Sequence, residues 1–362
     1  MVKPNILILE TQKHYFPNLY EEERFKALSK KFQGFVLAKG YNKFQKIKQS
    51  NFMLYLAPKS NLLHKILFPF ILIFTSIYLI IKNKIDLVIT TDPITTGICA
   101  IIIKILTGKK IVINLRGDSV EVNEILGKSK IKIKIMNTLS KFTIKHSDAV
   151  WYISNNLKDK YLSKKSFIIN EYVPVNYLFK QKTKRNKKIY FAGFPYKSKG
   201  LLILLKAFKS IQNEFPNFRL IIAGYDDMGK WKEIAKNLEI KNIVFRGSLK
   251  YKQLISELKD CYLACLPSYS EGLCRFLIEA QALGKPVIAS DNTGMKESVK
   301  NKVTGYLIKT GDYKELAEKL RILLKNKKKA KEMGKAGRKF VRTKFSEKKH
   351  IDEIYKMYLK IK

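Results

Sequence analysis

Arginine is scarce in a chain whose charge is strongly positive. The 362 residues carry 71 basic and 30 acidic side chains, a net charge of +41, yet only nine of the basic residues are arginine. Arginine binds bases and phosphates through two parallel hydrogen bonds, and nucleic-acid-binding proteins tend to concentrate it. We therefore expect no nucleic-acid partner. Besides nucleic-acid binding, which is the least favoured explanation of the lysine excess, two explanations stay open: a bias in composition, and attraction to an anionic membrane surface.

Cysteine is sparse as well. The four cysteines, Cys99, Cys261, Cys265 and Cys274, lack the paired spacing of a metal site, which predicts buried free thiols in a reducing compartment. The first apolar run, NILILE, is short and has no cleavage region, so we expect no signal peptide. Both observations favour a cytoplasmic location.

A long membrane-spanning run is also missing. Residues 66–81 form a stretch of 16 uncharged residues between Lys65 and Lys82. A helix needs about 20 apolar residues to cross a bilayer, so this stretch is slightly short. It leads directly into KIDLVITTDP, which is typical of a buried strand followed by a turn. Three alternatives stay open: a core helix, a helix that dips into the membrane surface, and a true span.

Short apolar runs alternate with helical patterns along the whole chain. In the first half we expect strands near residues 4–9, 33–38, 51–56, 85–90, 110–114 and 148–153, with helices at 61–81, 94–107 and 129–146. In the second half we expect strands near residues 188–192, 218–223, 242–246, 261–266, 286–289 and 304–308. This alternation is typical of parallel sheets covered by helices on both faces.

The alternation breaks near residues 170–188, in a lysine-rich connector that contains proline. We therefore predict an N-terminal Rossmann-like domain at 1–174, a linker at 175–187, a C-terminal Rossmann-like domain at 188–343, and a helix at 344–362 that packs back toward the first domain. The predicted fold class is α/β, with two parallel sheets facing a central cleft. Such sheets bind ligands at the carboxyl ends of their strands.

The stretch SEGLCRFLIEAQALGKPVIASD, residues 270–291, combines a polar loop with a helix. Its loop brings Ser268, Ser270 and Glu271 to a helix start, where a phosphate is expected at Gly272, Leu273, Cys274 and Arg275. Glu279 lies eight residues beyond Glu271, within about 80° of the same helix face and about 12 Å along the axis. The two acids are suited to hold hydroxyls at opposite ends of an extended ligand. The alternatives are a helix-capping acid for Glu271 and a surface charge for Glu279.

A second polar loop, in YFAGFPYKSKG (residues 190–200), follows the first strand of the second half. Gly193 permits a tight turn with a close ligand approach, and Lys199 and Gly200 open the next helix. A lysine at a helix start opposes the helix dipole, so its position indicates an anion to bind. The alternative is a solvated lysine.

Together these motifs resemble those of the family 4 glycosyltransferases, which have the GT-B fold. The pattern is G-x5-K-G, followed by P-S-x2-E-G-x6-E-A and then G-K-P-V-I-A. The matching residues are Gly193, Lys199, Gly200, Pro267, Ser268, Glu271, Gly272, Glu279, Ala280, Gly284, Lys285, Pro286, Gly294, Glu297 and Gly305. The resemblance covers the C-terminal half through motifs and the N-terminal half only through architecture.

The resemblance implies retaining transfer of a sugar from a nucleotide-diphosphate donor. We expect no metal cofactor, because fixed cations and a helix start can stabilise the negative charge of the leaving diphosphate. It gives catalytic roles to Glu271, which contacts the donor sugar, and to Lys199, which neutralises the leaving diphosphate; Glu279 holds the ribose hydroxyls. It also implies that the leaving phosphate helps to take the acceptor proton. Phe194 occupies a position where the family often has arginine, so Arg275 or Arg246 is expected to replace that cation.

The N-terminal half departs from the family in one respect. The family commonly has a glycine-rich loop after the first strand, whereas residues 9–24 contain no glycine. At a later strand end, Arg116 could hold an acceptor phosphate, and Asp118 could contact a sugar hydroxyl or assist the acceptor proton as a further catalytic residue. A structural Arg-Asp turn is the alternative. Residues 90–97, TTDPITTG, end another strand and are expected to line the same cleft.

The sequence thus predicts an enzyme that transfers a sugar to a glycan or lipid-linked acceptor at the inner face of the cell membrane. Its expected partners are the nucleotide-sugar donor, the acceptor and an anionic membrane surface. Two alternatives stay open. One is a soluble transferase acting on a free sugar or polysaccharide, and the other is a non-catalytic basic binding protein on the same scaffold.

Overall fold

The structure is a computed structural model of the chain, and it describes residues 3–10, 19–39, 44–58 and 62–362. The chain forms two compact units. Unit 1 comprises Met1–Val120, Ser129–Asn170 and Glu347–Lys362, and unit 2 comprises Glu121–Lys128 and Glu171–Ser346. Each unit is built around one sheet.

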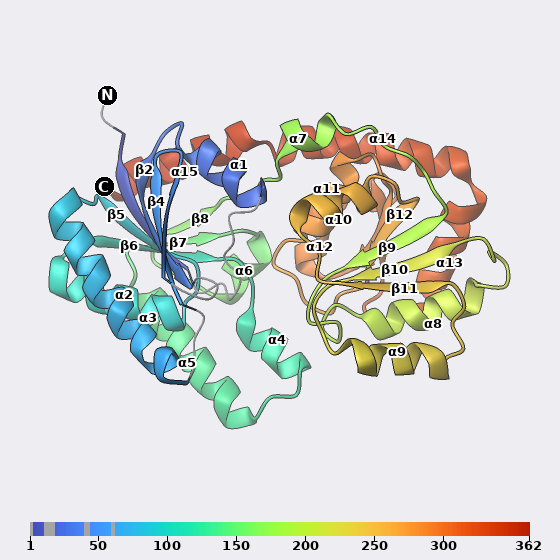
Figure 1. Cartoon of the computed structure of the whole chain (residues 1–362), viewed down its shortest axis with the longest axis horizontal. Helices are drawn as coiled ribbons and strands as arrows, with labels where there is room; N and C mark the ends of the chain where they lie inside the picture. Colours follow the sequence, from blue (N-terminus) through green and yellow to red (C-terminus); the bar gives the residue numbers. More distant parts are fainter. Residues whose placement is uncertain (1–2, 11–18, 40–43, 59–61) are drawn as a thin grey trace. The chain divides into compact units, whose positions relative to one another are not determined.

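Unit 1 contains an eight-stranded sheet with the strand order β3-β4-β2-β1-β5-β6-β7-β8 (Figure 1). Its strands are β1 (Asn5–Leu9), β2 (Gln33–Lys39), β3 (Gln45–Gln49), β4 (Phe52–Ala57), β5 (Leu87–Thr90), β6 (Lys110–Leu115), β7 (Ala149–Tyr152) and β8 (Ser166–Ile168). All neighbours are parallel except β3 and β4, which are antiparallel. The sequence did not predict β3, because QKIKQ has no apolar run and its side chains are half-buried or exposed, nor β8, which has three residues.

Helices cover both faces of this sheet (Figure 1). They are α1 (Leu19–Leu28), α2 (Leu62–Asn83), α3 (Thr95–Thr107), α5 (Lys130–His146), α6 (Asn155–Lys160) and α15 (Glu347–Ile361). Helix α4 (Ser119–Ile125) crosses the boundary between the residue sets of the two units. Helix α2 packs on α3 and α3 on α5, whereas α15 packs on α1. His350 of α15 is buried, and its Nδ1 lies 2.8 Å from the carbonyl oxygen of Asn170.

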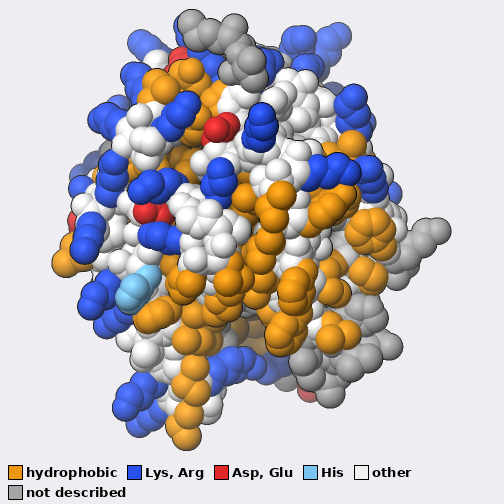
Figure 2. Space-filling view, turned by 90° about the vertical axis from the view of Figure 1, so that its left-hand side faces the viewer, with side chains coloured by type: hydrophobic (Ala, Val, Ile, Leu, Met, Phe, Trp, Pro, Cys, Tyr) orange, Lys and Arg blue, Asp and Glu red, His pale blue; other side chains and the backbone are white. Residues whose placement is uncertain are grey.

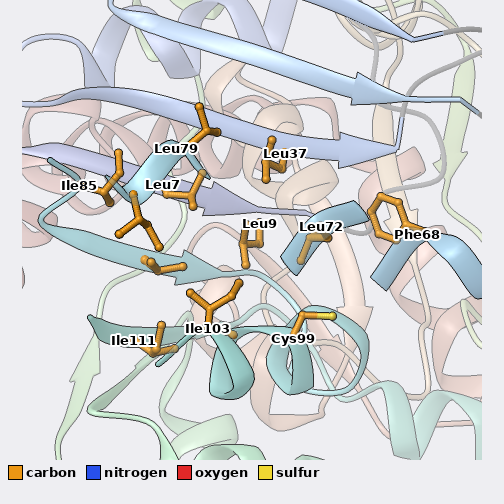
Figure 3. Close-up of a cluster of buried hydrophobic side chains, with 13 residues drawn as sticks. Leu7, Leu9, Leu37, Phe68, Leu72, Leu79, Ile85, Cys99, Ile103 and Ile111 are labelled. Atoms are coloured by element: carbon orange, nitrogen blue, oxygen red, sulfur yellow. The ribbon is translucent and has the colours of Figure 1, made fainter. Parts of the chain in front are cut away.

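The apolar segment predicted at residues 66–81 lies in α2, and one side of this helix belongs to the core of unit 1. Phe68, Leu72 and Leu79 pack with Leu7 and Leu9 of β1 in a buried cluster that also includes side chains of α3 (Figure 3). The predicted core helix is therefore confirmed for that side. No helix formed by the described residues is long and apolar enough to cross a membrane.

Unit 2 contains a six-stranded parallel sheet with the order β11-β10-β9-β12-β13-β14. The strands are β9 (Lys188–Ala192), β10 (Arg219–Ala223), β11 (Ile243–Gly247), β12 (Leu263–Leu266), β13 (Val287–Ser290) and β14 (Gly305–Ile308). The helices are α7 (Val175–Phe179), α8 (Leu201–Ile211), α9 (Met228–Asn237), α10 (Tyr251–Leu258), α11 (Arg275–Ala282), α12 (Thr293–Ser298), α13 (Tyr313–Lys325) and α14 (Lys327–Lys344). All six strands occur within two residues of their predicted positions. Five of them are mainly buried apolar runs, whereas β11 is mostly half-buried and includes Arg246.

The segment predicted as a linker, residues 175–187, is part of unit 2 and contains α7. Arg185 Nη2 donates to the carbonyl oxygen of Gly284 over 2.8 Å, and Lys285 Nζ donates to the carbonyl oxygen of Lys184. Lys285 is 1% exposed. Burial, assisted by the charge of Arg185, lowers the pKa of the Lys285 ammonium to about 8. The buried Lys285 thus links the turn after α11 to residues 175–187 by a hydrogen bond.

This buried lysine predicts a change of stability with pH. Below pH 8 both folded and unfolded chains hold the Lys285 proton, and the full penalty of burying the charge, about 3 kcal/mol, opposes folding. The penalty disappears as the pH rises from about 8 to the ordinary lysine pKa, because the folded chain releases the proton first. The contribution of Lys285 to stability should therefore rise across that window, whereas the buried thiols, whose pKa values burial raises, contribute in the opposite direction.

We expect Lys285→Met to stabilise the protein by about 1–3 kcal/mol at pH 7, since the lost hydrogen bond offsets part of the gain. Urea unfolding at pH 7 and pH 10 measures the effect, and the advantage of the variant should shrink at the higher pH. Lys335→Met, at an exposed position of α14, is the matched control. An equal difference between wild type and Lys285→Met at both pH values would contradict this account.

Candidate active site

The two polar loops found in the sequence follow two neighbouring strands of unit 2. Residues 193–200 follow β9 and residues 267–274 follow β12, and these strands pair in parallel. Strands β9 and β12 lie where the sheet order reverses, with β10 and β11 on one side and β13 and β14 on the other. Ligands bind open α/β sheets at the carboxyl ends of strands at such a point. The fold therefore places both loops at the expected position of a ligand site.

Lys199 and Glu271 meet at this edge of the sheet. Lys199 Nζ lies 2.7 Å from Glu271 Oε1, and the two side chains are 17% and 12% exposed. Burial alone lowers the pKa of a lysine, but the charge and the hydrogen bond of Glu271 outweigh it and raise the pKa of Lys199. Lys199 is thus held as a cation in a sheltered place. The alternative of a solvated lysine is wrong for Lys199, because its side chain is sheltered and paired. The alternative of a helix-capping acid is wrong for Glu271, because Cys274 occupies the N-cap of α11.

Three glycines allow the loops to approach so closely. A Cβ on Gly200, whose φ is +72°, would lie 1.9 Å from the carbonyl oxygen of Pro267, and one on Gly294 would lie 1.9 Å from that of Glu271. A Cβ on Gly193 would lie 3.0 Å from Lys199 Cγ, so this glycine makes room for the lysine stem. Backbone contact rather than side-chain packing therefore fixes the distance between Lys199 and Glu271.

Hydrogen bonds tie the same two loops together. The amide of Tyr269 donates to the carbonyl oxygen of Ser198 over 2.9 Å, and Ser268 Oγ donates to that oxygen over 3.1 Å. Asn292 Nδ2 donates to the carbonyl oxygen of Ser268 over 2.9 Å and so links the loop after β13 to this group. The loops after three neighbouring strands thus form one connected platform.

Glu279 lies on α11 and is buried, with an exposed fraction of 1%. Burial raises the pKa of its carboxyl group, while Arg275, whose Nε lies 3.3 Å from Glu279 Oε1, and the Tyr251 hydroxyl act in the opposite direction. The alternative of a surface charge is therefore wrong for Glu279. A buried acid that keeps a nearby cation is suited to accept hydrogen bonds from ligand hydroxyls.

The predicted anion site at the start of α11 is smaller than expected. The amide of Cys274 donates to Ser298 Oγ over 3.1 Å, and the amide of Arg275 donates to the carbonyl oxygen of Leu273 over 3.1 Å. Two of the four amides at residues 272–275 are thus used within the protein. The predicted phosphate contact is narrowed to Gly272 and Leu273.

The two arginines considered as replacements for a missing cation are each paired with a glutamate. Arg275 pairs with Glu279, and Arg246 Nε lies 3.0 Å from Glu257 Oε1. Phe194, at the position where the related family often has arginine, is 52% exposed. The prediction that either arginine replaces this cation therefore requires one of these pairs to open.

Unit 1 holds a separate group of charged residues at the carboxyl ends of its strands. Glu10 follows β1 and Arg116 follows β6. Arg24 Nη1 lies 2.7 Å from Glu10 Oε1 and 3.1 Å from Glu21 Oε2, and Arg116 Nη2 lies 3.9 Å from Glu10 Oε1. Burial raises the pKa of Glu21. The sequence pattern identified Arg116 but missed Glu10, Glu21 and Arg24. Glu10 could have been identified, because it is an acid directly after the buried strand β1.

Asp118 is held by neighbours in unit 1. Its Oδ1 accepts from the Tyr161 hydroxyl over 2.9 Å and from the Val120 amide over 3.0 Å, and its Oδ2 pairs with Lys160. These contacts are typical of a structural carboxylate, with Lys160 rather than Arg116 as the ionic partner. The role of Asp118 in proton transfer stays a prediction. Most of the glycine-free loop, at residues 11–18, lies outside the described residues.

Two Rossmann-like units, the second carrying this platform, define the GT-B fold, as predicted. Among solved structures with this architecture, a sucrose-phosphate synthase from Thermosynechococcus elongatus superimposes with a TM-score of 0.83 at 16% identity, covering 99% of both chains. Anabaena HepE, solved with UDP and glucose, gives a TM-score of 0.75 at 16% identity, covering 99% of this chain and 100% of that one.

Residues 177–340 match the family described as Glycosyl transferases group 1. The capsular polysaccharide biosynthesis glycosyltransferase CapM of Staphylococcus aureus is 30% identical over 180 residues, which are 48% of this chain and 46% of that protein. The chain spans about half to two thirds of the length of the first curated relatives that it matches.

The contact at Gly200 predicts a large loss of stability on a small change. Gly200→Ala should destabilise unit 2 by more than about 3 kcal/mol, because its Cβ would overlap a backbone oxygen. Gly127→Ala is the matched control: φ is +73° there as well, but nothing lies within 4 Å of the added Cβ. The control should cost about 1 kcal/mol, the usual penalty of a positive φ. Urea unfolding measures both, and equal losses would contradict the close approach of the loops.

Proposed function

We propose that the protein transfers a sugar from a nucleotide-diphosphate donor to an acceptor, with unit 2 binding the donor. The observation that carries the proposal is the sheltered pair of Lys199 and Glu271 at the point where the sheet order reverses. HepE, which has the same fold, was solved with UDP and glucose, and this supports a nucleotide sugar as the donor class. A non-catalytic scaffold would not need to keep this pair.

Lys199 stabilises the leaving group in this proposal. Departure of a nucleoside diphosphate concentrates negative charge on the phosphates, and a cation fixed in a sheltered site lowers the barrier without reorganising. The raised pKa of Lys199 keeps it protonated at neutral pH. When the donor binds, its diphosphate replaces Glu271 as the partner of Lys199. We propose no metal cofactor, since Lys199 supplies the cation.

The freed Glu271 contacts the donor sugar, and Glu279 accepts hydrogen bonds from the ribose hydroxyls. The amides of Gly272 and Leu273 face the phosphates. In this proposal the two acids bind the two ends of the donor, the sugar and the ribose, and Lys199 binds the diphosphate between them. Gly193 and Gly200 contribute by shape, because they allow Lys199 to stand against the loop of Glu271.

The reaction retains the configuration of the sugar. The bond between the anomeric carbon and the phosphate oxygen breaks, and the acceptor oxygen bonds to the same face of that carbon. The acceptor proton passes to the departing diphosphate. This course of the reaction needs no protein nucleophile. It also needs no protein base, and the Asp118 carboxylate is already held by Tyr161, Val120 and Lys160.

The acceptor is a lipid-linked or cell-surface glycan precursor at the cytoplasmic face of the membrane. The description of the relative CapM as a capsular polysaccharide biosynthesis glycosyltransferase supports this class of acceptor. In this proposal Arg116, which is partly exposed at the end of β6, contacts an acceptor phosphate. A transferase that acts on free sugars is the rival, and a panel of free and lipid-linked acceptors separates the two.

Lys199→Ala should lower kcat for transfer or donor hydrolysis by about 100- to 1000-fold, the usual cost of removing a group that stabilises developing charge. Release of nucleoside diphosphate from a panel of nucleotide sugars measures this. Lys197→Ala, exposed and two residues earlier in the same loop, is the control and should stay within about twofold of wild type. Lys199→Arg should recover part of the rate. Wild-type turnover by a folded Lys199→Ala protein would refute the proposed role.

Glu279→Gln should weaken recognition of the donor ribose. We expect wild type to prefer a ribonucleotide donor over its 2′-deoxy analogue by about 10-fold or more, and the variant to lose most of that preference, because a carboxylate accepts hydroxyls more strongly than an amide. The ratio of kcat/KM for the two donors measures this. Glu318→Gln, on the exposed side of α13, is the control. An unchanged preference in Glu279→Gln would exclude the ribose contact.

A further inference from the structure

The side of α2 that faces away from the core is also apolar. Its inner side carries Phe68, Leu72 and Leu79, which are buried in unit 1. Its outer side carries six large apolar side chains that are 41–75% exposed: Leu67, Phe70, Ile71, Phe74, Tyr78 and Ile81. A helix that is apolar all round needs apolar surroundings on both sides. The outer side of α2 is therefore covered by nothing that the described residues supply.

The two helices next to α2 continue this surface. Helix α3 exposes Ile102, Ile105 and Leu106, and α5 exposes Ile131, Ile135 and Phe142. Twelve of the 21 exposed large hydrophobic side chains in the described part of the chain thus lie on α2, α3 and α5, and Figure 2 shows apolar side chains gathered on this face of unit 1. We call it the α2–α3–α5 surface. Exposed apolar patches of this extent mark interaction sites.

The charge of the same surface has one sign. The 52 residues of α2, α3 and α5 include eight lysines and no aspartate or glutamate. Five of the lysines lie on α5, at positions 130, 132, 134, 141 and 145, and are exposed. At the far end of α2, Ile77, Ile81 and Leu106 line a groove bordered by Lys84 and Lys109. Lysines thus border this groove and line α5 beside the apolar side chains.

We propose that the α2–α3–α5 surface docks on a lipid bilayer that contains anionic lipids. A bilayer interface accepts apolar side chains without a matching shape, and its anionic headgroups attract the lysines around them. Tyr78 and Lys82 illustrate the fit: the ring of Tyr78 belongs to the apolar side, and Lys82 Nζ donates to its hydroxyl over 2.8 Å. The polar ends of both residues would lie at the headgroups.

This inference deepens the proposed function, since it gives the transferase a means to reach a lipid-linked acceptor. Its test does not require turnover. Binding of the full chain to vesicles is measured by flotation, with vesicles of phosphatidylcholine alone and of phosphatidylcholine mixed with phosphatidylglycerol. We expect binding to the mixed vesicles, and raised salt should weaken it because the lysine contribution is screened.

Two sets of variants separate the apolar from the charged contribution. Phe70→Ser with Phe74→Ser should weaken binding by about 10-fold or more, whereas Leu162→Ser, at a side chain that is 82% exposed outside the surface, should not. Charge reversal to glutamate at Lys132, Lys134 and Lys141 should weaken binding by at least about 100-fold. The same reversal at Lys328, Lys331 and Lys335 of α14 changes the net charge equally and should leave most of the binding intact.

Three results would overturn the inference. They are absence of binding to mixed vesicles, equal losses in the surface variants and their controls, and a concentration-dependent dimer that Phe70→Ser with Phe74→Ser abolishes. The last result would assign the surface to a second copy of the chain. Donor hydrolysis by the phenylalanine variants should match wild type, so a failure of lipid docking is distinguishable from a failure of the transferase proposal.

Discussion

The contact between the loops after β9 and β12 is the constraint on which the donor platform depends. Strand pairing brings the two loops side by side, and Gly200 and Gly294 let backbone meet backbone at Pro267 and at Glu271. Only then do Lys199 and Glu271 come within hydrogen-bonding distance. The charges of Lys199 and Glu271 offset part of the desolvation penalty of each other. A cation is thereby kept where anionic phosphates are proposed to bind.

The sequence predicted much of unit 2 because its signals are local. Apolar runs in the sequence locate the six strands, and the two motifs lie directly after β9 and β12, where a parallel sheet must place them at one edge. What it could not predict are contacts between distant residues. Glu10 and Arg24 are joined by folding of unit 1, and Asp118 meets Tyr161, 43 residues away. Lys285 belongs to the G-K-P-V-I-A motif, but only its environment in the folded chain reveals that it is buried.

Helix α2 shows a second limit of sequence reasoning. Residues 66–81 are apolar on every side, so periodicity gives no inner or outer face, and the predictions of a core helix and of a membrane-surface helix could not be separated. Packing against β1 and α3 assigns Phe68, Leu72 and Leu79 to the core and leaves Phe70 and Phe74 exposed. The two predictions describe opposite sides of one helix, and they are compatible.

The distribution of charge bears on the two explanations of the lysine excess. Five of the nine arginines are used within the protein, where they bind carboxylates or carbonyl oxygens: Arg24, Arg185, Arg246, Arg275 and Arg321. Bias in composition explains lysine in place of arginine on the surface. It does not explain the absence of acids from α2, α3 and α5, because an even spread of 30 acids over 362 residues would place about four among those 52. Exclusion of acids from the most apolar exposed surface is the pattern that an anionic membrane would select.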